Sequence, residues 1–437
     1  MKKILVYVIL FLTPIASTYS ADSTRIANLD SNNDLQQIFE ISNNFTVQIF
    51  AQVRFAFGSS EEGTSSGAGF LIDKKRGWIL TNAHVAQNSP GPIDVAFNEQ
   101  AFSPAKRVYI DPYFDIAIIG IDPTIIPDNA TEAKLDCNHK HTIGLEVAAF
   151  GHPWGLRFTA TRGIVSAYRY TEGYEQLQTD AALNSGNSGG ALVDLSTGMV
   201  IGINTAKLNK KEKKSEGLNF AVPSAHVCPI VALLSENRSA LPPLLEATFG
   251  RKLTTDAVFI ARDGENGWSK LKSGDQIISI ENLRVRNPAD VITILRGRTG
   301  PVKVKVIRNK KTEELLIQVQ ATKPILGSYG VDVSGILFAT PRRFGAEGAL
   351  DGFGAYVANI QDGSTGSICG AQAWDLLISV DNKVVRTIDE LYQYLTKTRE
   401  SPKVKFVVRR WSRSTYLRVE HFILECNIDA VNKIQIE

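Results

Sequence analysis

The stretch Leu183–Val193 reads LNSGNSGGALV and places Ser188 among glycines and small residues. Such a segment is either a glycine-rich turn between two strands or a tight turn that presents a nucleophile. A serine hydroxyl becomes a nucleophile only when a base lies within hydrogen-bond reach and a third group fixes that base. The role of Ser188 therefore depends on partners elsewhere in the chain.

Two other segments supply the residue types that such a serine needs. His84 follows the strand-like run GWILTNA, and Asp115 opens the β-branched run IAIIG. A carboxylate at the start of a buried run is costly unless it is paired, and a histidine would both pair with it and be oriented by it. Each residue alone fits an ordinary loop position. The order His84, Asp115, Ser188, together with GNSGG around the serine, favours a catalytic triad.

Length and composition limit the class of protein. The chain has 437 residues, enough for roughly two to four domains, and its 48 Lys and Arg nearly balance its 45 Asp and Glu. A nearly neutral chain has no strong field for nucleic acid or a membrane surface. Residues 1–21 contain two lysines, a short apolar run and then small residues, which is typical of a signal peptide. No later segment is apolar for long enough to predict a stable membrane span.

The hydrophobic pattern divides the rest of the chain. Short β-branched runs between turn residues extend from Thr46 to Val222 and predict an all-β barrel or sandwich. Helices are expected at 34–43 and from Pro223 onward, and SALPPLLE at 239–246 is interpreted as a linker. Beyond the linker, DQIISIENLRV at Asp275 aligns without a gap with DLLISVDNKVV at Asp375. A period of about 100 residues is too long for a solenoid unit and predicts two copies of one small domain.

Several motifs carry a family resemblance. TNAHV, DIAI, TDAALNSGNSGGALV, IGINTA and LNFAVPS occur in this order and resemble the HtrA (Deg) family of trypsin-like serine proteases with PDZ domains. The resemblance implies a mainly β fold, with a trypsin-like double β-barrel followed by two small α/β PDZ-like domains. The expected boundaries are a signal peptide at 1–21, a protease domain at 22–240, and PDZ-like domains at 245–323 and 326–428.

The resemblance also implies roles for individual residues. His84 is expected to be the general base, Asp115 the carboxylate that orients it, and Ser188 the nucleophile. The main-chain N–H groups of Gly186 and Ser188 would form the oxyanion hole, where one donor is typically worth about 100- to 1,000-fold in rate. The substrate backbone would pair as an added strand with Asn204, Thr205, Ala206 and Lys207.

Residues beside the nucleophile predict specificity and control, and Ala182, Leu183 and Asn187 are assigned to substrate binding. Digestive trypsin-like enzymes have an aspartate at the position of Asn187, where it pairs with a newly cut N-terminus. The asparagine favours control by loop ordering over zymogen cleavage. Ala182 stands where trypsin has the aspartate of its basic pocket, and it predicts, with Leu183, a preference for small or medium apolar side chains. Gly189 and Gly190 are expected to leave space for the substrate and the first barrel.

The PDZ-like repeats are expected to bind apolar C-terminal or extended peptides by strand addition. The candidate loops are 248–252, with Gly250, and 334–338, with Gly335, Ile336 and Leu337. The alternative, in which one repeat is only a spacer or an assembly surface, stays open. Where the first repeat has KSGD the second has QAWD, and Trp374 is expected to fill a gap in the core.

The cysteines form two groups along the chain, Cys137 with Cys228 and Cys369 with Cys426. One disulfide in each half and buried free thiols are both open. CNHKH at 137–141 lacks a fourth ligand at a usual spacing, so no metal site and no cofactor are expected.

The expected function is an exported, periplasmic, ATP-independent serine endopeptidase of protein quality control. Its expected substrates are unfolded or misfolded proteins, with the PDZ-like domains binding peptide C-termini or regulating access. The resemblance implies a homotrimer or higher homo-oligomer assembled through the N-terminal part of the protease. The alternatives are a chaperone-like holdase or regulatory scaffold with minor proteolysis, and a dedicated protease that cuts one partner.

Overall fold

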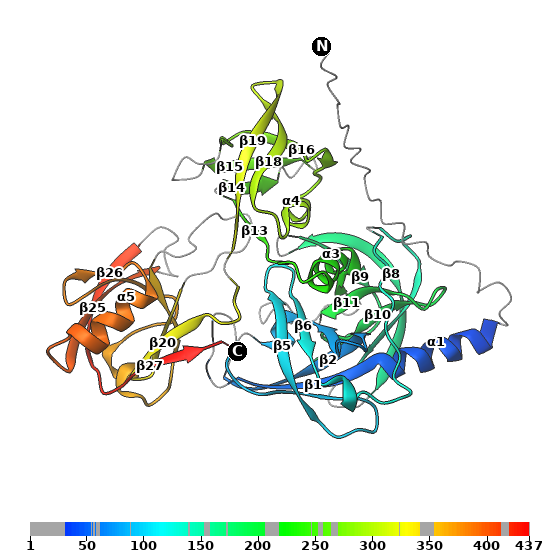
Figure 1. The fold of residues 1–437 in the computed structure, drawn as a ribbon, viewed down its shortest axis with the longest axis horizontal. Coiled ribbons are helices and arrows are strands. Elements are labelled where there is room, and N and C mark those ends of the chain that lie inside the picture. The colour runs from blue at the N-terminus through cyan, green and yellow to red at the C-terminus, as the bar shows by residue number, and fades with distance from the viewer. Residues whose placement is uncertain are drawn as a thin grey trace, which may run out of the picture.

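The computed structural model describes most of the chain from residue 31 onward, and the expected signal peptide at 1–21 lies outside the described residues. Within 31–437 the residues not described are 54, 56, 58–61, 88, 139, 153–157, 172–173, 206–217, 246, 252–256, 264–269, 323, 341–353, 412–418 and 437. The described part forms two closed β-barrels and then two open sheets, each with a short helix (Figure 1).

The first barrel is closed in the strand order β1-β2-β3-β6-β5-β4. Its strands are β1 (Thr46–Val53), β2 (Gly63–Asp73), β3 (Trp78–Thr81), β4 (Ile93–Ala96), β5 (Ser103–Asp111) and β6 (Ile116–Gly120). Alternate residues of β1 fill the barrel, where Val47, Ile49 and Ala51 are fully buried. Helix α1 (Ser31–Phe45) precedes β1 and is longer at both ends than the expected 34–43.

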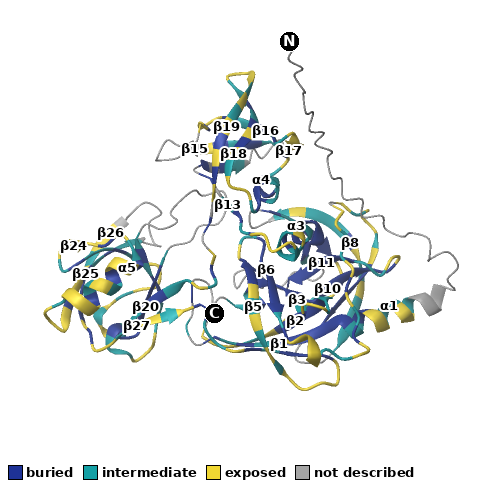
Figure 2. Ribbon diagram, viewed as in Figure 1, coloured by how far each residue is buried: buried dark blue, intermediate teal, exposed yellow. Residues whose placement is uncertain are grey.

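The second barrel is closed in the strand order β10-β11-β12-β9-β8-β7. Its strands are β7 (Glu146–Gly151), β8 (Thr159–Thr171), β9 (Tyr174–Thr179), β10 (Ala191–Asp194), β11 (Val200–Thr205) and β12 (Asn219–Pro223). The short helix η1 (Pro123–Ile125) lies between the barrels in the chain, and α3 (Ser224–Ser235) follows the second barrel as expected. The predicted double barrel is confirmed, and Figure 2 shows buried residues along strands such as β2, β3 and β11.

The two later sheets are built alike. The first contains β13 (Pro243–Leu244), β14 (Ala247–Arg251), β15 (Val258–Asp263), β16 (Gln276–Ile280), β17 (Leu283–Arg284), β18 (Gly300–Arg308) and β19 (Lys311–Ala321), with helix α4 (Pro288–Leu295). The second contains β20 (Tyr329–Val333), β21 (Ile336–Ala339), β22 (Ala355–Ile360), β23 (Leu376–Val380), β24 (Lys383–Val384), β25 (Lys403–Trp411), β26 (Val419–Asn427) and β27 (Val431–Gln435), with η3 (Thr365–Cys369), α5 (Ile388–Gln393) and η4 (Tyr394–Thr398).

One strand in each sheet lies outside the expected domain boundaries. β13 precedes residue 245 and pairs with β19, and β27 follows residue 428 and pairs with β20. Hydrogen bonding across the sheet assigns these strands to it, although each is short and separated from its partner in sequence. The boundaries 245–323 and 326–428 are therefore too narrow.

The internal repeat predicted from the sequence forms the same ion pair in both sheets. Asp275 accepts two hydrogen bonds from the guanidinium of Arg308, at 2.8 and 2.7 Å. Asp375 accepts two from Arg410, both at 2.7 Å. A two-pronged guanidinium–carboxylate contact is specific in geometry. The two sheets are therefore structural repeats, as the alignment of Asp275 with Asp375 predicts.

Trp374 does not fill a core gap. Its side chain is 55% exposed and stacks on Tyr356, with ring centroids 5.3 Å apart. Its backbone is left-handed, with φ of 74°, like the aligned Gly274 at 88°. The turn before the buried aspartate needs this conformation, and in the second sheet a tryptophan adopts it with its ring at the surface.

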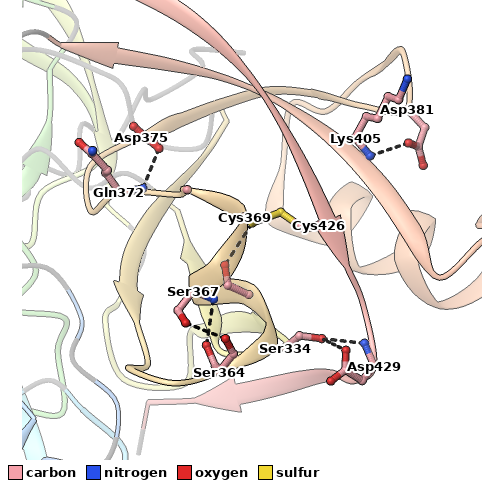
Figure 3. Close-up of a disulfide and its surroundings, with 12 residues drawn as sticks. Ser334, Ser364, Ser367, Cys369, Gln372, Asp375, Asp381, Lys405, Cys426 and Asp429 are labelled. Atoms are coloured by element: carbon pink, nitrogen blue, oxygen red, sulfur yellow. Dashed lines mark hydrogen bonds between the residues drawn. A yellow bond between two sulfur atoms is a disulfide. The ribbon is translucent and has the colours of Figure 1, made fainter.

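Two disulfides join the four cysteines, one within each half of the chain. Cys137 is bonded to Cys228 of α3, so the segment before β7 is tied to the helix that follows the second barrel. Cys369 is bonded to Cys426 and ties η3 to β26 (Figure 3). The two crosslinks close loops of different length, and each restricts the unfolded chain.

Candidate active site

His84 lies on the one-turn helix α2 (Ala83–Ala86), which follows directly from β3. Its Nδ1 lies 2.7 Å from Oδ2 of Asp115, and its main-chain N–H donates to Oδ1 of the same carboxylate at 3.0 Å. Asp115 is only 3% exposed, so its negative charge is held against one imidazole away from water. With Nδ1 committed to the carboxylate, Nε2 is the ring nitrogen that can take a proton from a nucleophile.

Asp115 lies in the turn before β6, and its backbone is held by hydrogen bonds from Asn82 and Ala83. Its backbone is left-handed, with φ of 57°, which aspartate tolerates better than most residues. Its carbonyl accepts the side-chain amide of Asn82 at 2.9 Å and the main-chain N–H of Ala83 at 3.2 Å. Asn82 therefore supports the backbone of Asp115, a role that sequence reasoning missed. The signal in the sequence was an asparagine within TNAHV, directly after an apolar strand.

The loop that carries Ser188 lies at the seam between the barrels. The carbonyl of Ser188 accepts the N–H of Ala68 in β2 at 2.8 Å. A side chain at Gly67 would meet Val85, the neighbour of His84, at 2.7 Å and the Ser188 carbonyl oxygen at 3.0 Å. The His84 turn and the Ser188 loop therefore meet over Gly67. Gly186 has φ of 102°, a conformation that favours glycine and lets the peptide turn toward the serine.

Gly189 packs against the first barrel and Gly190 against the second. The expected space for the first barrel is therefore found at Gly189. A Cβ on Gly189 would lie 2.1 Å from the carbonyl oxygen of Ala68 in the first barrel. A Cβ on Gly190 would lie 1.9 Å from the carbonyl oxygen of Phe150 in the second barrel. The two glycines let the nucleophile loop wedge between the barrels, and the space they leave is filled by these two backbones.

The residues expected to contact substrate fall into two groups. Ala182 is exposed and Leu183 is partly exposed, consistent with a place in a substrate pocket. Asn187 is buried against Gly151, and its side-chain amide donates to the Ala182 carbonyl at 3.4 Å. Thr161 donates its hydroxyl to the same carbonyl at 2.8 Å. Asn187 thus supports the backbone of Ala182, and its assignment to substrate binding stays a prediction.

Asn204 is also a supporting residue, contrary to expectation. It is fully buried, and its side-chain amide donates to the carbonyls of Phe150 at 3.2 Å and Ala191 at 2.9 Å. Its main-chain N–H and C=O are both bonded to the glycines after Ser188. Thr205 is buried and pairs with Phe220 in the β11–β12 ladder, while Ala206 and Lys207 lie outside the described residues.

The candidate peptide sites of the two later domains differ. Gly250 lies in β14, which is one of the two edge strands of its sheet among the described residues. Gly335, Ile336 and Leu337 lie where β21 begins, and β21 is paired with β20 on one side and β22 on the other. Ile336 and Leu337 are buried, so these residues do not offer an open edge. The outer edge of β20 is already covered by β27.

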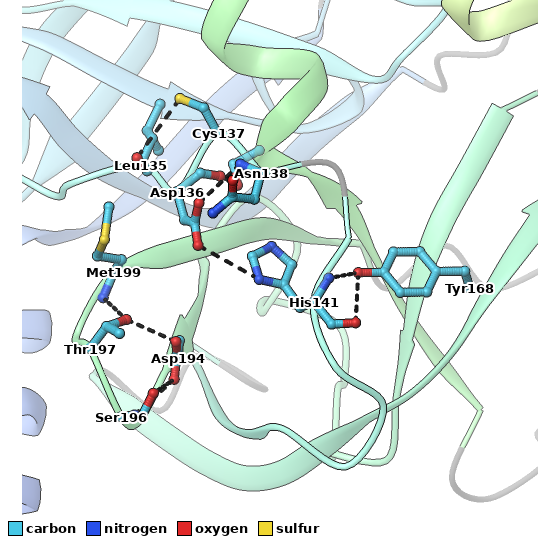
Figure 4. A network of polar contacts seen from close by, with 11 residues as sticks. Leu135, Asp136, Cys137, Asn138, His141, Tyr168, Asp194, Ser196, Thr197 and Met199 are labelled. Atoms are coloured by element: carbon cyan, nitrogen blue, oxygen red, sulfur yellow. Dashed lines mark hydrogen bonds and ion pairs between the residues drawn. The ribbon is translucent and has the colours of Figure 1, made fainter. Parts of the chain in front are cut away.

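The CNHKH segment has structural contacts. Cys137 is in a disulfide, and the Nδ1 of His141 lies 3.6 Å from Asp136, while Tyr168 bonds to the His141 backbone (Figure 4). His139 is not among the described residues. Across the described part of the chain, no group of three or more His, Cys, Asp or Glu side chains is arranged to hold a metal ion.

Two closed six-stranded barrels, with a His–Asp pair and a serine loop at their seam, define the class of trypsin-like serine proteases. In agreement, residues 67–203 match the family model of the trypsin-like peptidase domain. The chain is 32% identical over 364 residues to the periplasmic serine endoprotease DegP of Escherichia coli (strain K12), covering 77% of this chain and 73% of that protein. It is 29% identical over 376 residues to a probable periplasmic serine protease do/HhoA-like of Haemophilus influenzae, covering 81% of this chain and 78% of that protein.

Among solved structures, the HtrA-type protease AlgW with a tripeptide is similar to 66% of this chain and 98% of its own, at 25% identity and a TM-score of 0.54. The chain belongs to the HtrA (DegP) family of serine proteases. It is a serine endopeptidase with a role in protein quality control, and the holdase alternative is not favoured. The relatives are named periplasmic proteases, which supports an exported, periplasmic location. Over the residues described, no helix is long and apolar enough to cross a membrane.

Proposed function

We propose that His84, Asp115 and Ser188 are the catalytic triad of this endopeptidase. The observation that carries the proposal is the pair of hydrogen bonds from His84 to buried Asp115, next to the Ser188 loop. The Ser188 hydroxyl attacks the scissile carbonyl while Nε2 of His84 takes its proton, and Asp115 stabilises the resulting imidazolium. The imidazolium then protonates the leaving amine, and water releases the acyl group by the same steps in reverse order.

The main-chain N–H groups of Gly186 and Ser188 form the proposed oxyanion hole. The positive φ of Gly186 supports this, because it turns the peptide between the two donors. The negative charge of the tetrahedral intermediate would then meet two donors fixed before the reaction begins. The side chain of Asn187, which lies between these two residues, stabilises the loop by donating a hydrogen bond to the Ala182 carbonyl.

The test of the triad compares Ser188→Ala and Asp115→Asn with the wild-type chain. Ser188→Ala is expected to lower kcat by about 10⁶-fold and Asp115→Asn by about 10⁴-fold, with the fold unchanged, because each removes a member of a unit that acts together. The measurement is hydrolysis of an unfolded protein and a short peptide, with thermal unfolding as a check of folding. Wild-type cleavage by folded Ser188→Ala would refute the assignment of the nucleophile.

The proposed primary specificity is for small or medium apolar side chains. Exposed Ala182 and partly exposed Leu183 support it, since neither offers a charge to a basic side chain. Sequencing the cut sites in a digested peptide library should show valine, alanine or similar residues before the cut. A strong preference for arginine or lysine would contradict the proposal.

The proposed substrates are unfolded or damaged proteins, bound in part by the PDZ-like domains. The edge strand β14 supports capture by the first of these domains, because an extended peptide can add to an edge by main-chain hydrogen bonds. In the second domain β27 covers the edge of β20. A pull-down with inactive Ser188→Ala separates general capture of unfolded chains from a dedicated protease, which would enrich one partner.

Export by a signal peptide at 1–21 and assembly into homotrimers or higher oligomers complete the proposal. Phe39 packs on Phe150 and Phe45 on Phe70 inside the same chain. The aromatic pair left partly exposed near the N-terminal end of the protease is Phe50 with Phe102, with centroids 6.3 Å apart. Sedimentation of wild-type and Phe102→Ser protein tests whether this pair contributes to assembly, and unchanged mass would exclude it.

A further inference from the structure

A buried ion pair joins the first PDZ-like domain to the protease domain. Arg296 directly follows α4, and its guanidinium lies 2.6 Å from the carboxylate of Asp111, the last residue of β5. The two side chains are 1% and 0% exposed. Desolvating two charges is costly, and such a pair survives only with good geometry and further hydrogen bonds.

One nitrogen of the guanidinium, Nη1, makes further hydrogen bonds, whereas Nε and Nη2 have no acceptor in hydrogen-bond geometry among the described residues. Arg296 donates to the hydroxyl of Tyr109 at 2.7 Å and to the carbonyl of Ala240 in the linker at 2.8 Å. Burial and the neighbouring Asp111 raise the pKa of Tyr109 well above its usual value, so its hydroxyl keeps its proton. Burial alone would lower the pKa of Arg296, but Asp111 and Tyr109 outweigh it and raise that pKa. The charge of Arg296 is therefore retained.

Asp111 connects this ion pair to the triad carboxylate. Its other oxygen, Oδ1, accepts the main-chain N–H of Tyr113 at 3.0 Å and of Phe114 at 3.2 Å. The next residue is Asp115, which holds His84. One carboxylate thus contacts Arg296 with one oxygen and the turn leading to Asp115 with the other.

The ring of Phe114 is held between the Arg296 guanidinium and the ring of His226. Its centroid lies 5.3 Å from the Arg296 guanidinium and 4.5 Å from the ring of His226 on α3, which is stacked on it. A cation over an aromatic face is attractive, more so when both are buried. Phe114 is fully buried, so the residue before Asp115 is fixed by its side chain as well as by its backbone.

Helix α4 brings Arg296 to this position because it packs on the protease. Ala289 and Ile292 of α4 belong to the same hydrophobic core as the barrels, while other residues of the helix face β14. We propose that Arg296 of the first PDZ-like domain is a positioning residue for catalysis, which holds through Asp111 the turn that places Asp115 against His84. The proposal rests on Asp115 being the triad carboxylate.

The experiment measures kcat and KM for a short peptide with Arg296→Met and Arg296→Lys. Misplacement of a catalytic group by about 1 Å can cost 10²-fold, so we expect kcat of Arg296→Met to fall by about 10- to 100-fold with KM unchanged. Arg296→Lys should recover part of kcat, because it keeps the charge but lacks the fork that reaches several acceptors. The rate at which a fluorophosphonate labels Ser188 should fall in parallel.

A second variant covers the case in which the unpaired Asp111 prevents folding. Arg296→Met combined with Asp111→Asn removes both charges and keeps an acceptor for the turn, and its kcat should also fall. The matched control is Arg308→Met, which breaks an ion pair inside the same domain without contacting the protease turn and should leave kcat unchanged. Wild-type kcat in folded Arg296→Met or in the folded double variant would overturn the proposal. Asp115→Asn in the same assay separates this outcome from an error in the triad itself, since that variant would then be active too.

Discussion

At the scale of single residues, the proposed site depends on buried groups that hold its loops in place. Asn82 and Ala83 hold the Asp115 backbone, Asn204 holds the two glycines after Ser188, and Asn187 holds the pocket backbone. Asn82, Asn187 and Asn204 carry buried side-chain amides, and their hydrogen bonds to main-chain groups fix loops that otherwise have no regular structure. The reactive residues are therefore positioned by a layer of polar residues packed between the two barrels.

Gly189→Ala tests this tight packing. A Cβ would lie 2.1 Å from the Ala68 carbonyl, and φ of 86° adds backbone strain, so the Ser188 loop must move. A displaced nucleophile is expected to lose at least about 100-fold in kcat. The matched control is Gly144→Ala, whose φ of 93° is similar but whose Cβ would meet nothing within 4 Å. Equal activity of the two variants in a peptide assay would show that the close approach at Gly189 is unimportant.

At the scale of elements, the short strand β27 completes the second PDZ-like domain. It pairs with all of β20, from Tyr329 with Gln435 to Val333 with Val431. Lys433 lies over the rings of Tyr329 and of Tyr392 on α5, at 4.2 and 4.5 Å, so the strand also contacts the helix. An edge strand that would otherwise be open is thereby paired within the chain.

Removal of residues 431–437 should open this edge. The expected results are a lower thermal midpoint for the second domain and concentration-dependent self-association, because unpaired strand edges associate. Calorimetry and light scattering measure the two effects. The control Lys433→Ala keeps the strand and loses only the contacts with the two rings, so it should stay close to wild type. A shortened chain with unchanged midpoint and unchanged mass would show that β27 does not protect the edge.

At the scale of the whole molecule, three carboxylates couple stability to pH in the same direction. Burial alone would raise the pKa of Asp275, but the two-pronged bond from Arg308 outweighs it and lowers that pKa. Hydrogen bonds from Thr124 lower the pKa of Asp122, and Lys403 lowers that of Glu425. A group with a lowered pKa binds fewer protons when folded, so its stabilising effect is complete above the unfolded pKa and is lost as pH falls through the folded pKa.

The free energy of unfolding should therefore decrease on acidification below about pH 4, the usual range of carboxyl pKa values. Asp275→Asn is expected to be less stable than wild type at neutral pH and to show a weaker dependence on pH in the acid range. Guanidinium titrations at several pH values measure both quantities. If the free energy of unfolding fell equally steeply with decreasing pH in both proteins, this result would contradict a contribution from the Asp275–Arg308 pair.

The sequence indicated the class of fold and the residues that are proposed to react. Short β-branched runs predict a barrel or a sandwich, and the family resemblance implies the double barrel. The alignment of Asp275 with Asp375 predicts two related domains, and the order His84, Asp115, Ser188 predicts the triad. These signals are local, because the period of a strand and the chemistry of a side chain are properties of a short segment. The assignment of exposed Ala182 to the specificity pocket stays a prediction, and the sequence left open whether the cysteines form disulfides or free thiols.

Only the tertiary structure decided which residues are buried in support of the proposed site. Nothing in the sequence around Asn204 shows that its backbone is used by the glycines after Ser188, nor that Trp374 lies at the surface. The buried pair of Arg296 with Asp111 joins two domains across a long stretch of chain. Such contacts depend on how barrels and sheets pack together, and packing is set by the shape of many side chains at once, which no short motif records.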